Sequence, residues 1–334
     1  MSAYVAAPDY AHAVTLNPAS LAYVYNIYAA SDYESFARQP GELFLPSLPS
    51  QYLSSGTLNA WDVSAAFPVG PLGGGVCYSS FELGGWKTTV SSLGLAAGLP
   101  LGFSAGVTGK YVTFSRNYLA AEQVIAPSVM NANRFTFDIG AADRIELSNT
   151  TFFRAILSTG AVFSNVLNGL TLKPENQTAV GPVRNVNVQL PQTFSCGIAY
   201  TFASNYRLAD FELFKVMTAA DYVHLVGSDD PVDDFPSYKD QYRIGLETTA
   251  LGILAVRLGY TFKAPAVSGF DYYNNLHIAQ MGSGFSYGFS LRFPVKLVLP
   301  DWPLASLEMS YAKNPEWNTG MYHDLFGIIA ELAF

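Results

Sequence analysis

Two short stretches of the chain match the Gly-x-Ser-x-Gly pattern, which presents a nucleophilic serine in many hydrolases. They are GFSAG at 102–106 and GFSYG at 284–288. The pattern supports nucleophilic chemistry when the serine sits on a sharp turn between a strand and a helix. Both stretches instead lie inside runs of alternating small and apolar residues, and no helical pattern follows either one. We therefore interpret both matches as coincidental and predict no catalytic residue and no enzyme activity.

Metal-binding residue types are present, but their spacing predicts no site. The histidines are far apart in the sequence and show no ligand spacing; they are His12, His224, His277 and His323. Acidic residues concentrate at Asp229, Asp230, Asp233 and Asp234, where carboxylates could bridge calcium. That segment lacks the Asp-x-Asp-x-Asp-Gly spacing of a calcium loop, so we interpret it as a solvated acidic loop. We expect no cofactor and no disulfide between Cys77 and Cys196, which fall on separate predicted strands.

The composition limits the class of protein that carries these residues. Half of the 334 residues are hydrophobic and only 13% are charged, against roughly 25% charged in soluble domains. This number of charged residues is too small to cover a surface that faces water. We therefore expect much of the surface to face lipid. No run of about 20 apolar residues exists, which leaves a closed β-barrel as the membrane architecture. The net charge of −8 argues against nucleic acid as a partner.

Alternation with period two supports the barrel. In GFSYGFSLRF (284–293), one face carries Phe285, Tyr287, Phe289, Leu291 and Phe293, and the other face carries Ser286, Gly288, Ser290 and Arg292. The same division recurs in TFSCGIAYTF (193–202) and FTFDIGA (135–141). A soluble sandwich would place charges on its second face. Here the second face consists mostly of Gly, Ser, Thr and Ala, as a barrel interior tolerates.

The few charged residues in these runs fall on the small-residue face. Lumen-facing candidates are Lys110, Asp138, Arg243, Glu247, Arg257, Arg292, Glu308 and Glu331. An Arg or Lys on the lipid face would cost about 2–4 kcal/mol at midplane, so an inward ladder of both signs is cheaper. Two roles are open for these charges: they pin the barrel interior and its plug, or they contact a ligand directly.

Segments of this kind give about fourteen strands, an even number as bacterial outer-membrane barrels require. The predicted strands are 22–31, 58–68, 73–82, 87–98, 102–115, 134–146, 153–166, 192–203, 208–225, 239–249, 252–263, 283–293, 303–312 and 322–334. Short periplasmic connections are expected at 69–72, 99–101, 147–152, 204–207, 250–251 and 294–302. Longer ones are expected on the opposite rim at 32–57, 116–133, 167–191, 226–238 and 264–282. The predicted fold is an all-β transmembrane antiparallel barrel over residues 22–334, with a short N-terminal plug at residues 1–21.

Several stretches resemble the FadL-like outer-membrane transporters, and within them the PorV/PorQ-type branch with its spirochaete-like members. They are NPASLA, LPQTFSCGIAYTF, YRIGLETTALGILAVRLGYTF, LEMSYA and HDLFGIIAELAF. The resemblance implies a fourteen-stranded barrel and an N-terminal plug containing an Asn-Pro-Ala sequence, here Asn17, Pro18 and Ala19. It also links the terminal Phe334 to recognition by the barrel-assembly machinery.

The Asn17–Pro18 pair suits a turn out of the plug, because Asn caps its own backbone and Pro fixes φ. The alternative is an ordinary loop or a helix start, since Pro is favoured at the first helical position. The plug is shorter than in long FadL-type transporters, and residues 32–57 could compensate by folding inward. MSAYVAAPDY shows no secretion signal, as expected of a mature chain with an added Met.

Two classes of function fit this sequence. The first is a porin-like outer-membrane transporter that takes up a hydrophobic small molecule or lipid, such as a long-chain fatty acid, and releases it by plug movement. The second is a docking or gating partner of a protein-secretion system, as resemblance to the PorV branch implies. A cavity of about 300–1,000 Å³ would favour the first, because docking needs only exposed loops. Either protein would reside among the lipids of the bacterial outer membrane.

Overall fold

The structure of the chain, a computed structural model, describes most of the predicted strands and few of the predicted long loops. The described residues are 5–6, 10–37, 57–83, 86–117, 129–167, 170–174, 186–188, 192–208, 211–226, 238–265, 284–299, 301–315 and 322–333. The acidic segment Asp229–Asp234, His277 and the terminal Phe334 lie outside these residues, as does most of 32–57.

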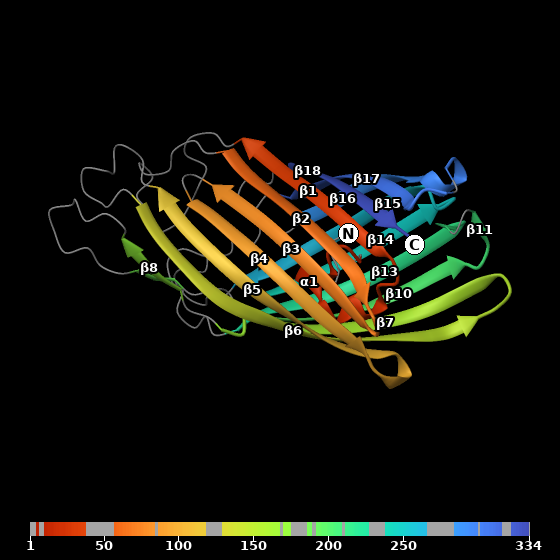
Figure 1. Ribbon diagram of the computed structural model, residues 1–334, viewed down its shortest axis with the longest axis horizontal. Coiled ribbons are helices and arrows are strands. Elements are labelled where there is room, and N and C mark those ends of the chain that lie inside the picture. Colours follow the sequence, from red (N-terminus) through yellow and green to blue (C-terminus); the bar gives the residue numbers. More distant parts are fainter. Residues whose placement is uncertain are drawn as a thin grey trace.

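Fourteen antiparallel strands form a closed ring (Figure 1). They are β1 (Ile27–Ala37), β2 (Thr57–Val69), β3 (Leu72–Leu83), β4 (Trp86–Gly98), β5 (Phe103–Asn117), β6 (Val129–Asn149), β7 (Phe153–Ser164), β10 (Gln192–Ser204), β13 (Phe214–Val226), β14 (Tyr238–Ala250), β15 (Leu254–Pro265), β16 (Gly284–Pro294), β17 (Leu304–Pro315) and β18 (Tyr322–Leu332). Each strand pairs with the next in this order, and β1 closes the ring by pairing with β18, from Ile27 opposite Leu332 to Ser35 opposite Asp324. The prediction of an all-β barrel of about fourteen strands is confirmed.

Four short strands stand apart from the ring. β8 (Leu170–Pro174) pairs with one end of β6 and with β9 (Val186–Val188), inside the stretch 167–191 that we predicted as loop. β11 (Arg207–Leu208) and β12 (Phe211–Glu212) form a small ribbon of their own. The predicted strand 208–225 therefore begins too early, because this ribbon occupies its first residues and β13 starts only at Phe214.

The predicted first strand, 22–31, also begins too early. Helix α1 (Ala13–Leu16) is followed by the 3₁₀ helix η1 (Pro18–Tyr23), and β1 starts at Ile27. Pro18 occupies the first turn of η1, and the side chain of Asn17 caps it by accepting a hydrogen bond from the Ala19 amide at 3.1 Å. The Asn17–Pro18 pair therefore begins a short helix, and its predicted place in a plug is a separate question of position inside the barrel. Within the described residues, no helix has the length and apolarity needed to cross a bilayer.

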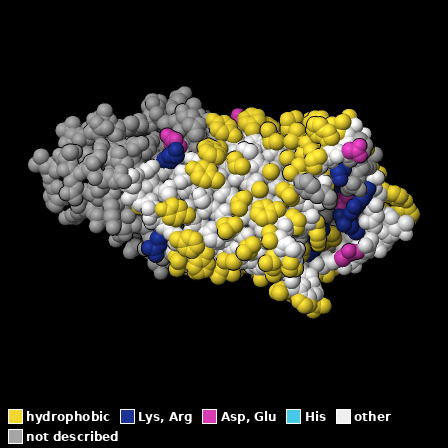
Figure 2. Space-filling view, in the orientation of Figure 1, with side chains coloured by type: hydrophobic (Ala, Val, Ile, Leu, Met, Phe, Trp, Pro, Cys, Tyr) yellow, Lys and Arg dark blue, Asp and Glu magenta, His cyan; other side chains and the backbone are white. Residues whose placement is uncertain are grey.

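Inward and outward side chains alternate as predicted. In β16, Phe285, Tyr287 and Phe289 are exposed, whereas Ser286 and Ser290 are buried in the interior. On the face shown in Figure 2, apolar side chains cover much of the body of the barrel, and charged ones gather mostly toward its two ends. A belt of outward aromatic residues follows the strands on the side of the long loops; it includes Tyr33, Trp61, Tyr78, Tyr111, Phe135, Tyr242, Phe262, Phe285, Tyr287 and Phe326. An apolar band bordered by aromatic residues is the exterior of a membrane barrel.

Candidate functional site

The N-terminal segment, here residues 10–24 with Val5 and Ala6, lies inside the ring, where α1 is visible in Figure 1. Val14 and Leu21 are fully buried and belong to one hydrophobic cluster with Ala66 and Ala96 of the barrel wall. Burying a Val or Leu side chain contributes about 1.5–3 kcal/mol relative to exposure. The segment is therefore held to the wall partly by an apolar core of its own.

Asn17 joins two parts of this segment to the wall. It is completely buried, and its Nδ2 donates to the Val5 carbonyl at 2.9 Å and to the Ala141 carbonyl of β6 at 3.3 Å. Its Oδ1 accepts from Ala19, as described above. Pro18 and Ala19 are buried beside it. All three residues predicted for the plug thus lie at the contact between the segment and the strands.

Inward-facing glycines make the close approach of the segment possible. A Cβ at Gly106 of β5 would lie 2.5 Å from the backbone carbonyl of Pro18, and one at Gly94 of β4 would lie 2.9 Å from Leu21. Heavy atoms in ordinary contact stand about 3.5–4.0 Å apart, so these positions admit no side chain. Glycines from five consecutive strands share this property, and they are Gly73, Gly75, Gly94, Gly106, Gly140 and Gly160. We call these six residues the glycine cradle.

Polar contacts complete the attachment of the segment. Thr108 of β5 donates to the carbonyl of Val14 at 2.8 Å, and the amide of Val5 donates to the carboxylate of Asp221 in β13 at 3.0 Å. The hydroxyl of Tyr23 donates to the carbonyl of Gly102 at 2.6 Å. Burial raises the pKa of Tyr23, which keeps the hydroxyl protonated as a donor. Hydrogen bonds therefore reach the segment from two separated strands of the wall, β5 and β13, and from the turn at Gly102.

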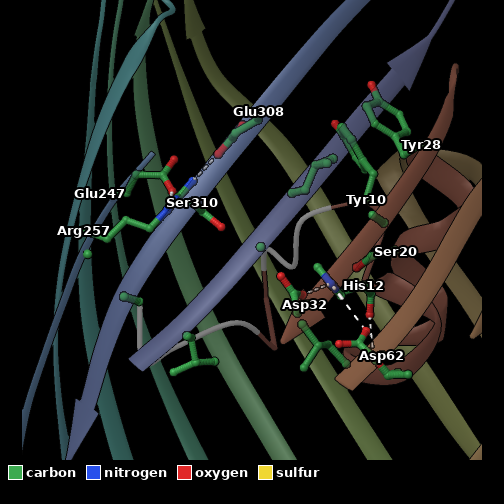
Figure 3. A pocket seen from close by; sticks show the side chains of 18 of the residues that line it. Tyr10, His12, Ser20, Tyr28, Asp32, Asp62, Glu247, Arg257, Glu308 and Ser310 are labelled. Carbon is green, nitrogen blue, oxygen red and sulfur yellow. Dashed lines mark hydrogen bonds and ion pairs between the residues drawn. The ribbon is translucent and has the colours of Figure 1, made fainter. Parts of the chain in front are cut away.

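A chain of ion pairs crosses the wall formed by β13 to β17. Lys215 lies 2.7 Å from Glu247, and Glu247 lies 2.8 Å from Arg257. Arg257 then contacts Glu308 at 3.1 Å (Figure 3). Glu308 also pairs with Arg292 at 2.6 Å. Four of the predicted lumen charges thus form one connected network, the charged wall, together with Lys215, which the sequence analysis did not select.

The other predicted lumen charges have local partners. Lys110 pairs with the fully buried Asp138 at 2.5 Å. Arg243 donates to the side chain of Gln241 at 2.7 Å. Glu331 accepts hydrogen bonds from Asn26, Tyr28 and Ser306. Glu331 lines the same cavity as the charged wall, whereas Lys110, Asp138 and Arg243 are not among the residues that line it.

A cavity of about 940 Å³ lies between the N-terminal segment and the charged wall. Tyr10 lines it from the segment, and Arg257 and Glu308 line it from the wall (Figure 3). Leu16 of the segment lines it as well. Its lining mixes aromatic and aliphatic side chains with charges of both signs. A volume of 300–1,000 Å³ is typical of small-molecule sites. The arrangement can therefore hold a ligand with both apolar and polar parts.

The serines of the two Gly-x-Ser-x-Gly stretches occupy strand positions. Ser104 lies in β5, and its hydroxyl donates to Tyr23 Oη at 3.1 Å and to the Ala142 carbonyl at 3.3 Å. Ser286 lies within β16. Neither serine stands on the strand-to-helix turn that a nucleophile elbow needs. Cys77 in β3 and Cys196 in β10 are free thiols.

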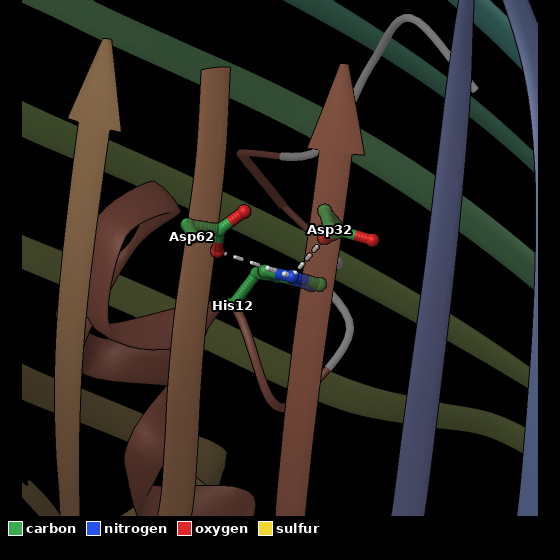
Figure 4. A group of neighbouring side chains, drawn as sticks. All are labelled: His12, Asp32 and Asp62. Carbon is green, nitrogen blue, oxygen red and sulfur yellow. Dashed lines mark ion pairs between the residues drawn. The ribbon is translucent and has the colours of Figure 1, made fainter. Parts of the chain in front are cut away.

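One cluster escaped the sequence analysis. His12 of the N-terminal segment lies 2.5 Å from a carboxylate oxygen of Asp32 in β1 and 3.8 Å from one of Asp62 in β2 (Figure 4). In the sequence analysis, Asp32 is placed in a loop, and the histidines are too far apart in the sequence to predict a metal site. Alternation continuing from buried Ala30 to Asp32 was the available signal, because it puts the carboxylate on the inner face.

No protein family matches the sequence, and no curated protein is similar to it. Among solved structures, the chain resembles the "CymD monoaromatic hydrocarbon channel", with 12% identity over 99% of this chain and 94% of that chain and a TM-score of 0.52. The structure of a Pseudomonas aeruginosa FadL homologue matches with 12% identity, covering 99% of this chain and 96% of that chain, with a TM-score of 0.48. The likeness to the first shows that the two chains share a barrel fold.

Proposed function

We propose that this protein is a FadL-like channel of the bacterial outer membrane that takes up hydrophobic small molecules such as long-chain fatty acids, and that it is not an enzyme. The cavity between the N-terminal segment and the charged wall carries this proposal. It has the volume of a ligand site and lies inside the barrel, beside the segment that fills part of the lumen.

The exterior of the barrel supports a membrane location. Phe285, Leu258 and Ile328 point outward with about half or more of their side-chain surface exposed, which is costly in water and favourable in lipid. The strand β16 has 11 residues, close to the roughly 9–11 that a tilted strand needs to cross a bilayer. Outer-membrane lipid is therefore the proposed surrounding of this surface, and the barrel-assembly machinery the proposed route to it.

The lining of the cavity favours an amphipathic ligand. Tyr10, Leu16 and Met217 offer apolar contacts for a hydrocarbon chain, while Lys215 and Arg292 offer cationic groups for a carboxylate. Lys215 and Arg292 are also the outer members of the charged wall, where they pair with Glu247 and Glu308. A fatty acid matches both parts of this lining. The predicted lumen charges would then act on the ligand as well as pinning the interior.

We propose further that the N-terminal segment is the gate. Asn17, Pro18 and Ala19 hold it in the glycine cradle, and the cavity lies along its free side. Movement of the segment away from the cradle would widen the lumen without changing the strand ring, because the ring closes through β1 and β18 independently of the segment.

Uptake of radiolabelled palmitate tests the transport proposal. The assay uses Gram-negative cells that lack their own outer-membrane fatty-acid transporter and express this chain. Ser310→Trp places an indole at a residue that lines the cavity, whereas Met309→Trp places it at the neighbouring outward position, which is 46% exposed. We expect uptake in the native chain and in Met309→Trp, and a strong loss in Ser310→Trp.

Native mass spectrometry of the same purified barrels gives an independent measure of palmitate binding. Equal uptake by Ser310→Trp and the native chain would contradict a route through this cavity. No uptake and no bound palmitate in any folded variant would favour the second class of function, docking in protein secretion as in the PorV/PorQ-type branch. That role depends on the outer loops, most of whose residues lie outside the described part of the chain.

A further inference from the structure

Three ligating side chains from three separate elements meet at one edge of the cavity. His12 comes from the N-terminal segment, Asp32 from β1 and Asp62 from β2 (Figure 4). One donor atom from each side chain lies within 4.8 Å of the other two. The three side chains are 15%, 30% and 24% exposed, so they are shielded yet open to the cavity that they line.

The strand register brings the two carboxylates together. Asp32 and Asp62 are direct cross-strand partners on the inner face, and like charges at such positions destabilise a sheet. Neighbouring β18 leaves room for this arrangement, because a Cβ at Gly327 would collide with the carboxylate of Asp32. The wall therefore holds two acidic groups side by side, directly facing an imidazole that belongs to a different part of the chain.

We propose that His12, Asp32 and Asp62 bind one divalent transition-metal ion, with Zn²⁺ as the representative ion, and that this ion fastens the N-terminal segment to the barrel wall. A doubly charged ion neutralises the negative charges of both carboxylates, whereas one imidazolium carries only a single positive charge. The site lies at the junction between the segment and the ring. Occupancy would therefore add a removable attachment to the fixed contacts of the glycine cradle.

The donor set favours zinc over calcium or magnesium. One imidazole nitrogen and two carboxylate oxygens are ligands that Zn²⁺ accepts, whereas Ca²⁺ and Mg²⁺ prefer oxygen alone. Tetrahedral zinc with ligands at about 2.0–2.1 Å requires donor atoms about 3.3 Å apart. The His12 pairs, 2.5 Å to Asp32 and 3.8 Å to Asp62, reach that value through shifts below about 1 Å. Water from the cavity would fill the fourth position.

Zinc titration of the full, EDTA-treated chain in detergent tests the site. Isothermal titration calorimetry should show one strong Zn²⁺ site in the native chain and binding at least about tenfold weaker in His12→Gln and in Asp62→Asn, as loss of even an outer-shell partner costs 10–100-fold. His224→Gln is the matched control, since His224 also faces an aspartate, Asp240, at 2.8 Å in the wall outside the cluster. We expect that variant to bind zinc like the native chain.

Hydrogen exchange tests whether the ion fastens the segment. Amides of residues 10–24 should exchange more slowly with Zn²⁺ than with EDTA in the native chain and in His224→Gln, but not in His12→Gln. Anomalous gel migration before boiling serves as the folding control for each variant. Native-like zinc affinity in His12→Gln, absence of a strong site in the native chain, or exchange unchanged by bound zinc would each overturn the proposal. None of these measurements depends on palmitate transport.

Discussion

Replacing one glycine of the cradle by alanine should loosen the N-terminal segment while leaving the ring intact. Gly106→Ala introduces a Cβ at 2.5 Å from the carbonyl carbon and oxygen of Pro18. These are backbone atoms of a capped helical turn, so no side-chain rotation can relieve the contact. The segment must shift as a unit, and it gives up part of its contact with β5 when it does.

The size of the effect follows from the cost of overpacking, about 1–3 kcal/mol for an added methyl group in a tight interior. That cost falls on the docked state alone, because the wall accommodates the methyl once the segment has left. The equilibrium between docked and released segment should therefore shift by about 5- to 150-fold toward release. The apolar burial of Val14 and Leu21 opposes release, so we expect a larger open fraction rather than a permanently open barrel.

Single-channel conductance in planar bilayers measures that fraction directly. Gly98→Ala is the control, because Gly98 ends β4 at the rim and a Cβ there meets no atom within 4 Å. We expect more frequent or longer open events in Gly106→Ala and native behaviour in Gly98→Ala. If both folded variants conduct alike, the cradle does not hold a gate, and the close packing of Gly106 against Pro18 serves only the stability of the barrel.

Three further outcomes are expected. Deleting residues 2–16 should leave a folded barrel that passes small solutes faster in liposome swelling; unchanged permeability would refute gating by the segment. Arg257→Met removes the centre of the charged wall and should lower the free energy of unfolding in urea by about 1–3 kcal/mol, less than for a fully buried pair because the Arg257 side chain is 24% exposed; an unchanged free energy of unfolding would contradict a stabilising role for this network. Phe289→Arg should impair insertion into lipid vesicles by about 2–4 kcal/mol, and Ser310→Arg, on the inner face, should impair it less; equal defects would contradict the assignment of faces.

Much of the barrel could be predicted because its constraints are local in sequence. A strand that faces lipid on one side and small residues on the other must alternate, so β16 could be assigned residue by residue. The start of the first strand was misplaced because residues 22–28 are rich in aromatic and β-branched residues, which suit a strand. The capped turn at Asn17 and Pro18 instead continues as η1 to Tyr23, and the preference of that local motif prevailed over strand propensity.

The contacts inside the lumen could not be predicted from any single segment of the sequence. The small-residue face could be recognised in the sequence. Its contact with the N-terminal segment, however, depends on which glycines the strand register places side by side across β3 to β7. The cluster of His12, Asp32 and Asp62 depends on the register between β1 and β2 and on the path of the segment inside the ring. Both are set by the closure of the whole barrel, so periodicity and spacing could not reveal them.

Gly327 links the cluster of His12, Asp32 and Asp62 to the closure of the barrel. The glycine belongs to the last strand, and its missing side chain makes room for Asp32 of the first strand, across the seam where the two ends of the ring meet. Asp32 therefore reaches its final surroundings only when β1 and β18 have paired. A metal ion bound here would therefore show that the wall is complete. In a chain in which β1 and β18 had not paired, the space that Asp32 occupies beside Gly327 would be absent.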